Sequence, residues 1–388
     1  MNNLFNNTRI AFSLKKDSEL ERAYFLFKMI ANEPLVRIGT AMTNFAIKAH
    51  LPVEGLIRAT VFDHFCGGVS EDDCIPVINK MYEKRVCSVL DYSVEGKEDE
   101  AQFDAAFDMT IKLLDFVKEK DAIPFAVFKP TGFGRIDLYE KIGNNIKLTH
   151  DESEEWSRVV SRYNRVCALA KEKDVKLLID AEESWMQSAA DDLITEMMRK
   201  YNTEKAIVFN TLQMYRWDRL DYLKSLHKEA NEKEFYVGLK LVRGAYMEKE
   251  NERAKLNGYK SPICVNKIAT DKNFNDGVEF MLKNSDRLSL FAGTHNEESS
   301  YLVMKLMQDN NISLNSDKVW FGQLYGMSDH ITYNLSETGY NVAKYLPFGP
   351  VKDVMPYLIR RAEENTSVAG QTTRELNLLK EERKRRKL

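Results

Sequence analysis

The spacing of apolar residues along the chain changes once, close to residue 85. Between residues 17 and 82, apolar positions recur at helical spacing, as in SELERAYFLFKMIAN and VRIGTAMTNFAIKAH, and no strand pattern interrupts them. Beyond this point, short β-rich runs alternate with polar stretches of helical pattern. The runs are VCSVLDYSV, PFAVFKP, VKLLIDAE, AIVFNTLQ, VGLKLVRG, LSLFAGTH, KVWFGQLYG and VAKYLPFG. The pattern predicts eight strands alternating with eight helices over residues 86–365.

A regular alternation of strands and helices favours a parallel sheet. Eight such units in about 280 residues have the size of a closed (β/α)8 barrel of the TIM type. An open, doubly wound sheet is the alternative, but such sheets usually carry a GxGxxG turn after the first strand, and the sequence has none. We therefore expect an α/β protein in three parts: an N-terminal helical arm (1–84), a barrel (85–370) and a basic C-terminal tail (371–388).

Composition narrows the class of protein. The chain has 388 residues, of which 44% are hydrophobic and 30% are charged, and its net charge of −3 argues against bulk binding of nucleic acid. Its five cysteines form no CxxC pair and its six histidines no HExxH motif, so neither a disulfide framework nor a metal site is expected. No apolar run reaches the ~18–20 residues of a membrane-spanning helix. We expect a soluble, cytoplasmic protein.

Polar side chains stand at the carboxyl ends of seven predicted strands, which is where barrels of this type place their active sites. They are Lys129, Asp180, Gln213, Lys240, Arg243, Thr294, His295, Gln323 and Tyr345, and the eighth helix adds Arg360, Arg361 and Glu364. Basic groups outnumber acidic ones, which suits an anionic ligand, since paired guanidinium groups hold a carboxylate or phosphate bidentately. The apolar and aromatic residues that would form a dry wall are Leu241, Tyr246, Leu324, Tyr345 and Tyr357.

Five segments carry a resemblance to a known family: KLVRGAY, DAEESW, GTHN, LYGM and, above all, YLPFGPVKDVMPYLIRRAEENTS. In order and content they resemble the proline dehydrogenase (proline oxidase) family, monofunctional type, from about residue 85 to residue 370. The resemblance implies a distorted (β/α)8 barrel that binds FAD non-covalently. It also implies oxidation of L-proline to Δ1-pyrroline-5-carboxylate, with the electrons passed to a membrane quinone. Neither a metal nor a nucleic-acid partner is implied.

The resemblance assigns the substrate-binding residues. The adjacent Arg360 and Arg361 would clamp the substrate carboxylate with help from Lys129, and Glu364 would temper these positive charges. The residues expected to pack on the pyrrolidine ring are Leu241, Leu324, Tyr345 and Tyr357.

The resemblance also assigns the flavin contacts. Gln213 would contact the edge of the isoalloxazine ring, and Thr294 and His295 would hold the cofactor from the sixth strand. The segment expected to hold the pyrophosphate contains Val242, Arg243, Gly244 and Ala245. Two residues are assigned to catalysis: Lys240 would lie beside flavin N5 and stabilise the electron-rich reduced flavin, and Asp180 would organise Lys240 or Lys129.

Other interpretations remain open. Hydroxyproline is the rival substrate within the family. A phosphate-binding aldolase or isomerase would use the same basic groups, with Lys240 as a Schiff-base lysine, and a barrel that only binds its ligand is the non-enzymatic alternative. The final KEERKRRKL has six basic residues in nine. It fits either a solvated helix end or a patch attracted to anionic lipid, which would give peripheral contact with the inner face of a membrane.

Overall fold

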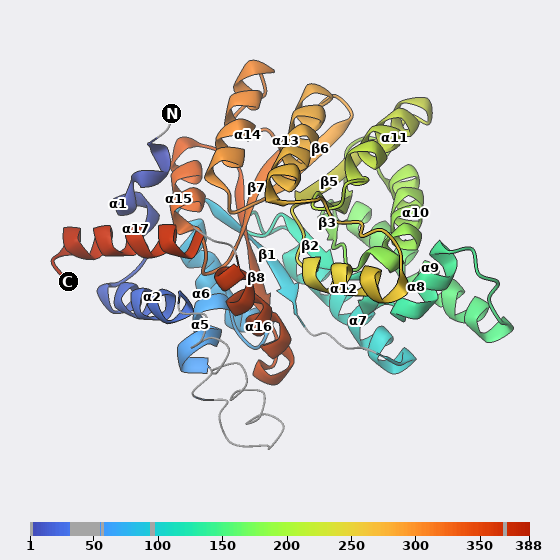
Figure 1. Cartoon of the computed structure of the whole chain (residues 1–388), viewed down its shortest axis with the longest axis horizontal. Coiled ribbons are helices and arrows are strands. Elements are labelled where there is room, and N and C mark those ends of the chain that lie inside the picture. The colour runs from blue at the N-terminus through green and yellow to red at the C-terminus, as the bar shows by residue number, and fades with distance from the viewer. Residues whose placement is uncertain (1–2, 32–54, 56–57, 94–97, 368–370) are drawn as a thin grey trace. The chain divides into compact units, whose positions relative to one another are not determined.

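The computed structural model describes residues 3–31, 55, 58–93, 98–367 and 371–388 (Figure 1). Eight strands follow one another in chain order and close into a barrel. They are β1 (Val86–Tyr92), β2 (Phe125–Phe128), β3 (Lys176–Ile179), β4 (Val208–Gln213), β5 (Val237–Val242), β6 (Leu288–Gly293), β7 (Val319–Leu324) and β8 (Val342–Phe348). The pairs of β1 with β8 and of β2 with β3, β3 with β4, β4 with β5 and β5 with β6 are all parallel. The predicted (β/α)8 barrel is confirmed, and the open sheet is excluded.

Helices fill the connections between strands. They are α7 (Glu100–Val117), α8 (Ile136–Gly143), α9 (His150–Glu172), α10 (Ser184–Tyr201), α11 (Arg219–Glu232), α12 (Met247–Asn257), α13 (Lys267–Lys283), α14 (Glu297–Asp309) and α15 (Asp329–Thr338), and α16 (Val351–Ser367) follows β8. The sequence marks several of their starts with capping side chains. Thr149 and Glu152 form a reciprocal capping box at the start of α9, which satisfies two amide groups that the helix itself leaves unpaired.

The strands are apolar along their length because both of their faces are covered. All four residues of β2 and all seven of β8 are buried. Parallel strands with helices on one side and a filled barrel on the other are expected to show continuous burial rather than alternation. This explains why the sequence shows these strands as short unbroken apolar runs.

The chain divides into two compact units. Unit 1 comprises residues 1–95, 295–297 and 322–388, and unit 2 comprises residues 96–294 and 298–321.

Unit 1 contains β1 and β8, which pair in register with Val86 opposite Val342 and Tyr92 opposite Phe348. Its remaining helical elements are η1 (Leu4–Asn6), α1 (Thr8–Ala11), α2 (Asp17–Ile30), η2 (Arg58–Phe62), α5 (Asp63–Phe65), α6 (Glu71–Tyr82) and α17 (Gln371–Arg386). The helix expected from SELERAYFLFKMIAN is present as α2, whereas VRIGTAMTNFAIKAH lies outside the described residues.

The first and last helices of unit 1 pack together. Leu378 and Leu379 of α17 share a buried apolar cluster with residues of the N-terminal segment: Ala11, Phe12, Leu20, Ala23 and Phe27. Ion pairs flank this cluster, from Arg383 to Glu21 at 2.6 Å and from Arg386 to Asp17 at 3.0 Å. Several arginines of the basic tail therefore neutralise acidic groups within the unit.

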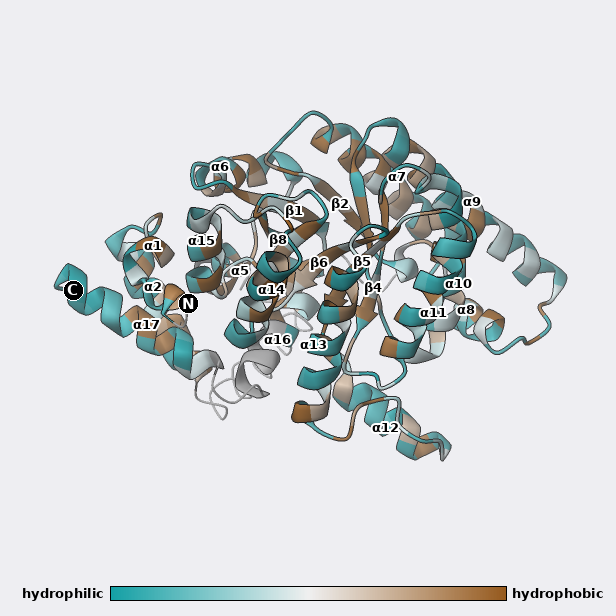
Figure 2. Ribbon diagram, turned by 90° about the horizontal axis from the view of Figure 1, so that it is seen from above, coloured by the Kyte–Doolittle hydropathy of each residue, from teal (hydrophilic) through white to brown (hydrophobic). Residues whose placement is uncertain are grey.

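Unit 2 contains strands β2 to β6 with the helices that follow them. The ring of Phe125 meets three other aromatic rings edge-on, those of Phe209, Phe291 and Trp320, with centroid separations of 5.1–5.8 Å. Figure 2 shows apolar residues concentrated on β4, β5 and β6 and polar residues along α11 and α13. The apolar core of this unit is therefore formed mainly by residues of the strands.

Among the described residues, no helix combines the length and the apolar content that crossing a membrane requires. No group of three or more His, Cys, Asp or Glu side chains in the same residues is arranged to hold a metal ion.

Candidate functional site

Two lysines share one aspartate near the carboxyl ends of β2, β3 and β5 in unit 2. Asp180 directly follows β3, and its backbone amide donates to the carbonyl of Phe128 on β2 at 3.0 Å. Lys240 of β5, which is 5% exposed, donates to Oδ1 of Asp180. Nζ of Lys129, the residue after β2, lies 3.6 Å from Oδ2. Asp180 thus pairs with both lysines that the sequence suggested as alternatives.

A buried carboxylate, that of Glu182, lies two residues beyond Asp180. It accepts hydrogen bonds from the amide and the hydroxyl of Thr131, at 2.9 and 2.7 Å, and so fixes the turn that follows Lys129. Burial raises the pKa of Glu182 to about 7, although the Thr131 bonds and the charge of Lys129 act in the opposite direction. Sequence reasoning missed Glu182, and its only signal was its place in DAEESW, close to Asp180.

Arg243, at the end of β5, is held by three acceptors. Its guanidinium donates to Oδ1 of Asp271 at 2.7 Å and to the hydroxyls of Thr294 and Ser299 at 2.9 Å each. It also lies over the ring of Phe274, 4.5 Å from the ring centroid. The structure therefore brings Arg243 and Thr294 together, and it adds Asp271 and Ser299, which the strand-end pattern could not show because both lie in helices.

The turn after Arg243 requires glycine. Gly244 has a φ of 123°, and a Cβ atom there would lie 2.6 Å from the ring of Tyr215. Backbone bonds of 2.7 Å from Met214 to the carbonyl of Val242 and from Tyr215 to that of Arg243 tie this turn to the end of β4. The exposed Ala245 follows it.

Gln213 ends β4 and is 2% exposed. Its Oε1 atom is buried and accepts no hydrogen bond from any described residue. Because an unpaired buried polar atom costs free energy, it calls for an explanation such as a ligand.

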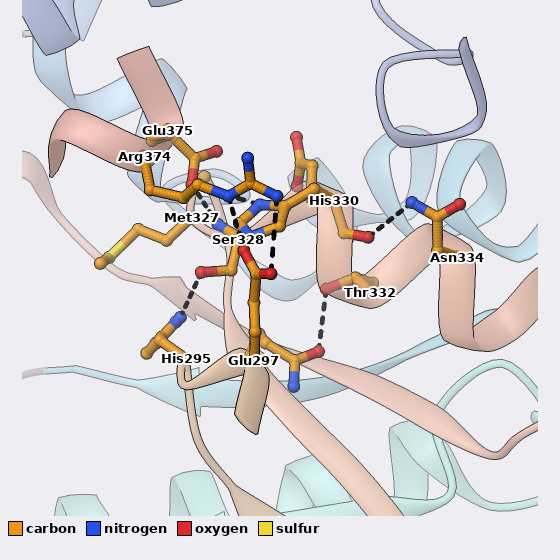
Figure 3. A network of polar contacts seen from close by, with 12 residues as sticks. His295, Glu297, Met327, Ser328, His330, Thr332, Asn334, Arg374 and Glu375 are labelled. Atoms are coloured by element: carbon orange, nitrogen blue, oxygen red, sulfur yellow. Dashed lines mark hydrogen bonds and ion pairs between the residues drawn. The ribbon is translucent and has the colours of Figure 1, made fainter. Parts of the chain in front are cut away.

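In unit 1, His295 follows β6 closely and contacts the segment after β7. Its Nδ1 lies 2.9 Å from the hydroxyl of Ser328 (Figure 3). Glu297, two residues further on, pairs with His330 at 3.1 Å and with Arg374 of α17 at 2.7 Å. Burial opposes the shift, but these two partners lower the pKa of Glu297 to about 2.

Of the residues expected to surround the substrate ring, Leu324 is partly buried and the others are buried. Leu241 is fully buried on β5 in unit 2. In unit 1, Tyr345 on β8 is 8% exposed, and Tyr357 of α16 belongs to an apolar cluster against which Leu324 packs. Oε1 of Gln323 accepts a hydrogen bond of 2.9 Å from the hydroxyl of Thr332 on α15.

The prediction that RRAEE is helical is confirmed, because the segment lies within α16. Arg360 is half-buried on this helix. Arg361 and Glu364 belong to the same helix, but their side chains lie outside the part of the chain whose side chains the structure describes.

A buried ion triad in unit 1 was not expected from the sequence. Lys344 of β8 is fully buried and donates to Asp329 at 2.7 Å, and Lys15 lies 3.0 Å from the other oxygen of this carboxylate. Burial alone would raise the pKa of Asp329, yet the two lysines hold it well below its ordinary value. The triad joins the N-terminal segment to the barrel side of the unit.

Comparison with known proteins identifies the family. The family model described as "Proline dehydrogenase" matches residues 74–374. "Carbapenem antibiotics biosynthesis protein CarD" of Pectobacterium carotovorum subsp. carotovorum is 36% identical over 362 residues, which cover 93% of this chain and 94% of that protein. "Proline dehydrogenase 1, mitochondrial" of Arabidopsis thaliana is 30% identical over 422 residues, which cover 97% of this chain and 85% of that protein.

The fold is also found in solved structures. The structure of proline utilization A from Bdellovibrio bacteriovorus gives a TM-score of 0.69 at 21% identity and covers 93% of this chain. This chain spans 38% of that longer protein. These matches confirm the resemblance seen in the sequence and the prediction of an enzyme of the oxidoreductase class. The chain belongs to the proline dehydrogenase family.

Proposed function

We propose that this protein oxidises L-proline to Δ1-pyrroline-5-carboxylate with FAD as cofactor and a quinone as the final electron acceptor. The observation that carries the proposal is the group of Lys129, Asp180 and Lys240 at the ends of β2, β3 and β5, in a chain of the proline dehydrogenase family. In this group two ammonium groups approach the same carboxylate.

The residues at the ends of β4, β5 and β6 suit FAD. Gln213 carries a buried acceptor atom that a donor on the isoalloxazine ring would satisfy. Arg243 offers a cation fixed by its neighbours, and Gly244 leaves room for close approach of a phosphate to the backbone. We assign Val242, Ala245, Thr294 and His295 to the same cofactor. When bound, FAD supplies the acceptor for a hydride from the substrate.

We assign the substrate carboxylate to Arg360, Arg361 and Lys129, because guanidinium groups and an ammonium bind it by charge-assisted hydrogen bonds. The ring would lie against apolar and aromatic side chains: Leu241, Leu324, Tyr345 and Tyr357. Glu364 would offset part of the positive charge.

The positive charges have a second consequence. The secondary amine of proline must lose its proton before its neighbouring carbon can give up a hydride. Nearby cations such as Lys129 and Arg360 disfavour the ammonium form and lower the pKa of the amine. Lys240, held by Asp180, would stabilise negative charge that develops as the reaction proceeds.

The second candidate is hydroxyproline as the substrate of the same oxidation. Membership of the proline dehydrogenase family argues against the aldolase, the isomerase and the purely ligand-binding barrel.

An absorption spectrum of the purified protein tests the proposal. Flavin bands should be present, and anaerobic L-proline should bleach them, whereas D-proline should leave them intact. Re-oxidation by a soluble quinone would support the acceptor. A colourless protein that does not take up added FAD would overturn the proposal, and a flavoprotein reduced only by hydroxyproline would favour the second candidate.

A further inference from the structure

Two adjacent residues of α17 reach the segments that follow β6 and β7. Arg374 donates through Nε to Glu297 at 2.7 Å, and Glu375 accepts from the backbone amide of Ser328 at 3.1 Å (Figure 3). Glu375 is 4% exposed, and its Oε2 also lies 3.6 Å from Nδ1 of His330. A carboxylate buried this deeply needs such partners, so its position is well defined by them.

Ser328 adopts a backbone conformation that serine rarely takes. Its φ of 52° and ψ of 40° lie in the left-handed region, which is unfavourable for residues other than glycine. The bond from its amide to Glu375 stabilises this conformation. The same residue places its hydroxyl 2.9 Å from Nδ1 of His295. Glu375 therefore fixes the residue that orients the His295 ring.

Glu297 provides a second connection between α17 and the segment that contains His295. This residue lies two positions after His295, and both Arg374 and His330 hold its carboxylate. The short segment 295–297 is thus fixed at its first residue through Ser328 and at its last residue through Arg374. Both contacts depend on α17.

Helix α17 is anchored independently of these loops. Leu378 and Leu379 are buried against the N-terminal helices, and Arg383 pairs with Glu21. A helix anchored in this way can hold a loop residue in place.

We propose that Arg374 and Glu375 are positioning residues for the cofactor, and that α17 orients His295 through Ser328 and Glu297. This inference rests on the proposed function, in which His295 contacts FAD. It gives the last helix of the chain a role in cofactor binding in addition to its packing on α2.

The test measures the dissociation constant of FAD for the full-length apoprotein by titration. Ser328→Gly removes the hydroxyl but keeps the left-handed backbone accessible, so it isolates the contact to His295. It should weaken FAD binding by roughly 3- to 10-fold, the effect of one lost hydrogen bond. Glu375→Ala should weaken it by about 10-fold or more, and Glu375→Gln, which keeps an acceptor for Ser328, should restore most of the loss.

Arg383→Ala is the matched control, because it removes an ion pair of the same helix that faces α2. It should lower thermal stability no more than Glu375→Ala does and should leave FAD affinity unchanged. The hydrogen exchange of residues 295–297 should rise in the Ser328 and Glu375 variants only.

The outcomes separate the two proposals. If the wild-type protein does not bind FAD, the proposed function fails. If the wild type binds FAD and Ser328→Gly binds it with the same affinity, the inference about α17 is wrong. The same conclusion follows if Arg383→Ala weakens FAD binding as much as Glu375→Ala does, since the helix would then act only through general stability. Should Glu375→Ala fail to fold, Ser328→Gly alone decides.

Discussion

Lys240 donates a hydrogen bond to the carboxylate of Asp180, which Lys129 approaches from the other side. Removing the carboxylate leaves two ammonium groups next to each other in a largely buried place. Asp180→Asn should therefore lower the free energy of unfolding by about 3 kcal/mol, since the buried Lys240 loses a charged partner. It should also lower kcat/KM for proline, and thermal or urea unfolding with steady-state kinetics measures both effects.

Asp317→Asn is the control for this change. It breaks the pair between Lys176 and an aspartate whose side chain is 64% exposed, so the stability should change by no more than about 0.5 kcal/mol. Equal stability of Asp180→Asn and the wild type would mean that the lysines do not depend on Asp180.

The pKa of Glu182 predicts a pH-dependent stability. Burial raises this pKa to about 7 from an ordinary value of 4.5, so the folded protein holds the proton more tightly than the unfolded chain does. The stabilisation is complete below the unfolded pKa and is lost as the pH rises through about 7, to a total of about 3 kcal/mol. Glu182→Gln removes this proton equilibrium. Urea unfolding from about pH 5 to pH 8 should show the wild type losing stability relative to the variant.

Glu172→Gln, at the exposed end of α9, should follow the wild type over the same pH range. A difference between Glu182→Gln and the wild type that stays constant with pH would show that Glu182 does not titrate there.

The arginines of α16 should govern the affinity for the substrate. Arg360→Met or Arg361→Met removes a charge-assisted hydrogen bond to the carboxylate, which is worth about 1.5–3 kcal/mol. KM for proline should therefore rise on the order of 10- to 150-fold. Lys352→Met, an exposed position on the same helix, should leave KM unchanged. Unaltered kinetics in both arginine variants would mean that these arginines do not bind the substrate and that RRAEE is only a solvated helix surface.

Tyr345 should set the preference between proline and trans-4-hydroxyproline. Its ring is buried on β8, and overpacking a dry pocket with the extra hydroxyl costs roughly 1–3 kcal/mol. We expect the wild type to favour proline in kcat/KM, and Tyr345→Ser to narrow the gap mainly by losing proline activity. Steady-state assays of both substrates with a soluble acceptor measure the ratio. A wild type that prefers hydroxyproline, or an unchanged ratio in the variant, would exclude Tyr345 as the ring contact.

The barrel could be predicted because its strands are local and apolar. Runs such as FAVF and KLLI consist mainly of apolar residues, which predicts that they are buried. In the helices between them, apolar residues recur at helical spacing instead. The strand ends follow directly from the same pattern, which is why Lys129, Asp180 and Arg243 were all identified as candidates. Their chemical roles came from the family resemblance and remain proposals.

The contacts that the sequence could not show join residues far apart along the chain. Lys15 meets Asp329, and Arg374 meets Glu297, although neither pair lies within one helix or one turn. The spacing of residues along the sequence cannot predict such ion pairs, because they depend on how the folded helices and strands pack. For the same reason the sequence could not show that Arg383 pairs with Glu21 and Arg386 with Asp17.

The packing of α17 on α2 has a consequence for biosynthesis. Leu378 and Leu379 complete the cluster around Phe12 and Phe27, so the N-terminal helices lack their partner until the end of α17 has emerged from the ribosome. Helices α1 and α2 thus complete their packing only after α17 has been translated.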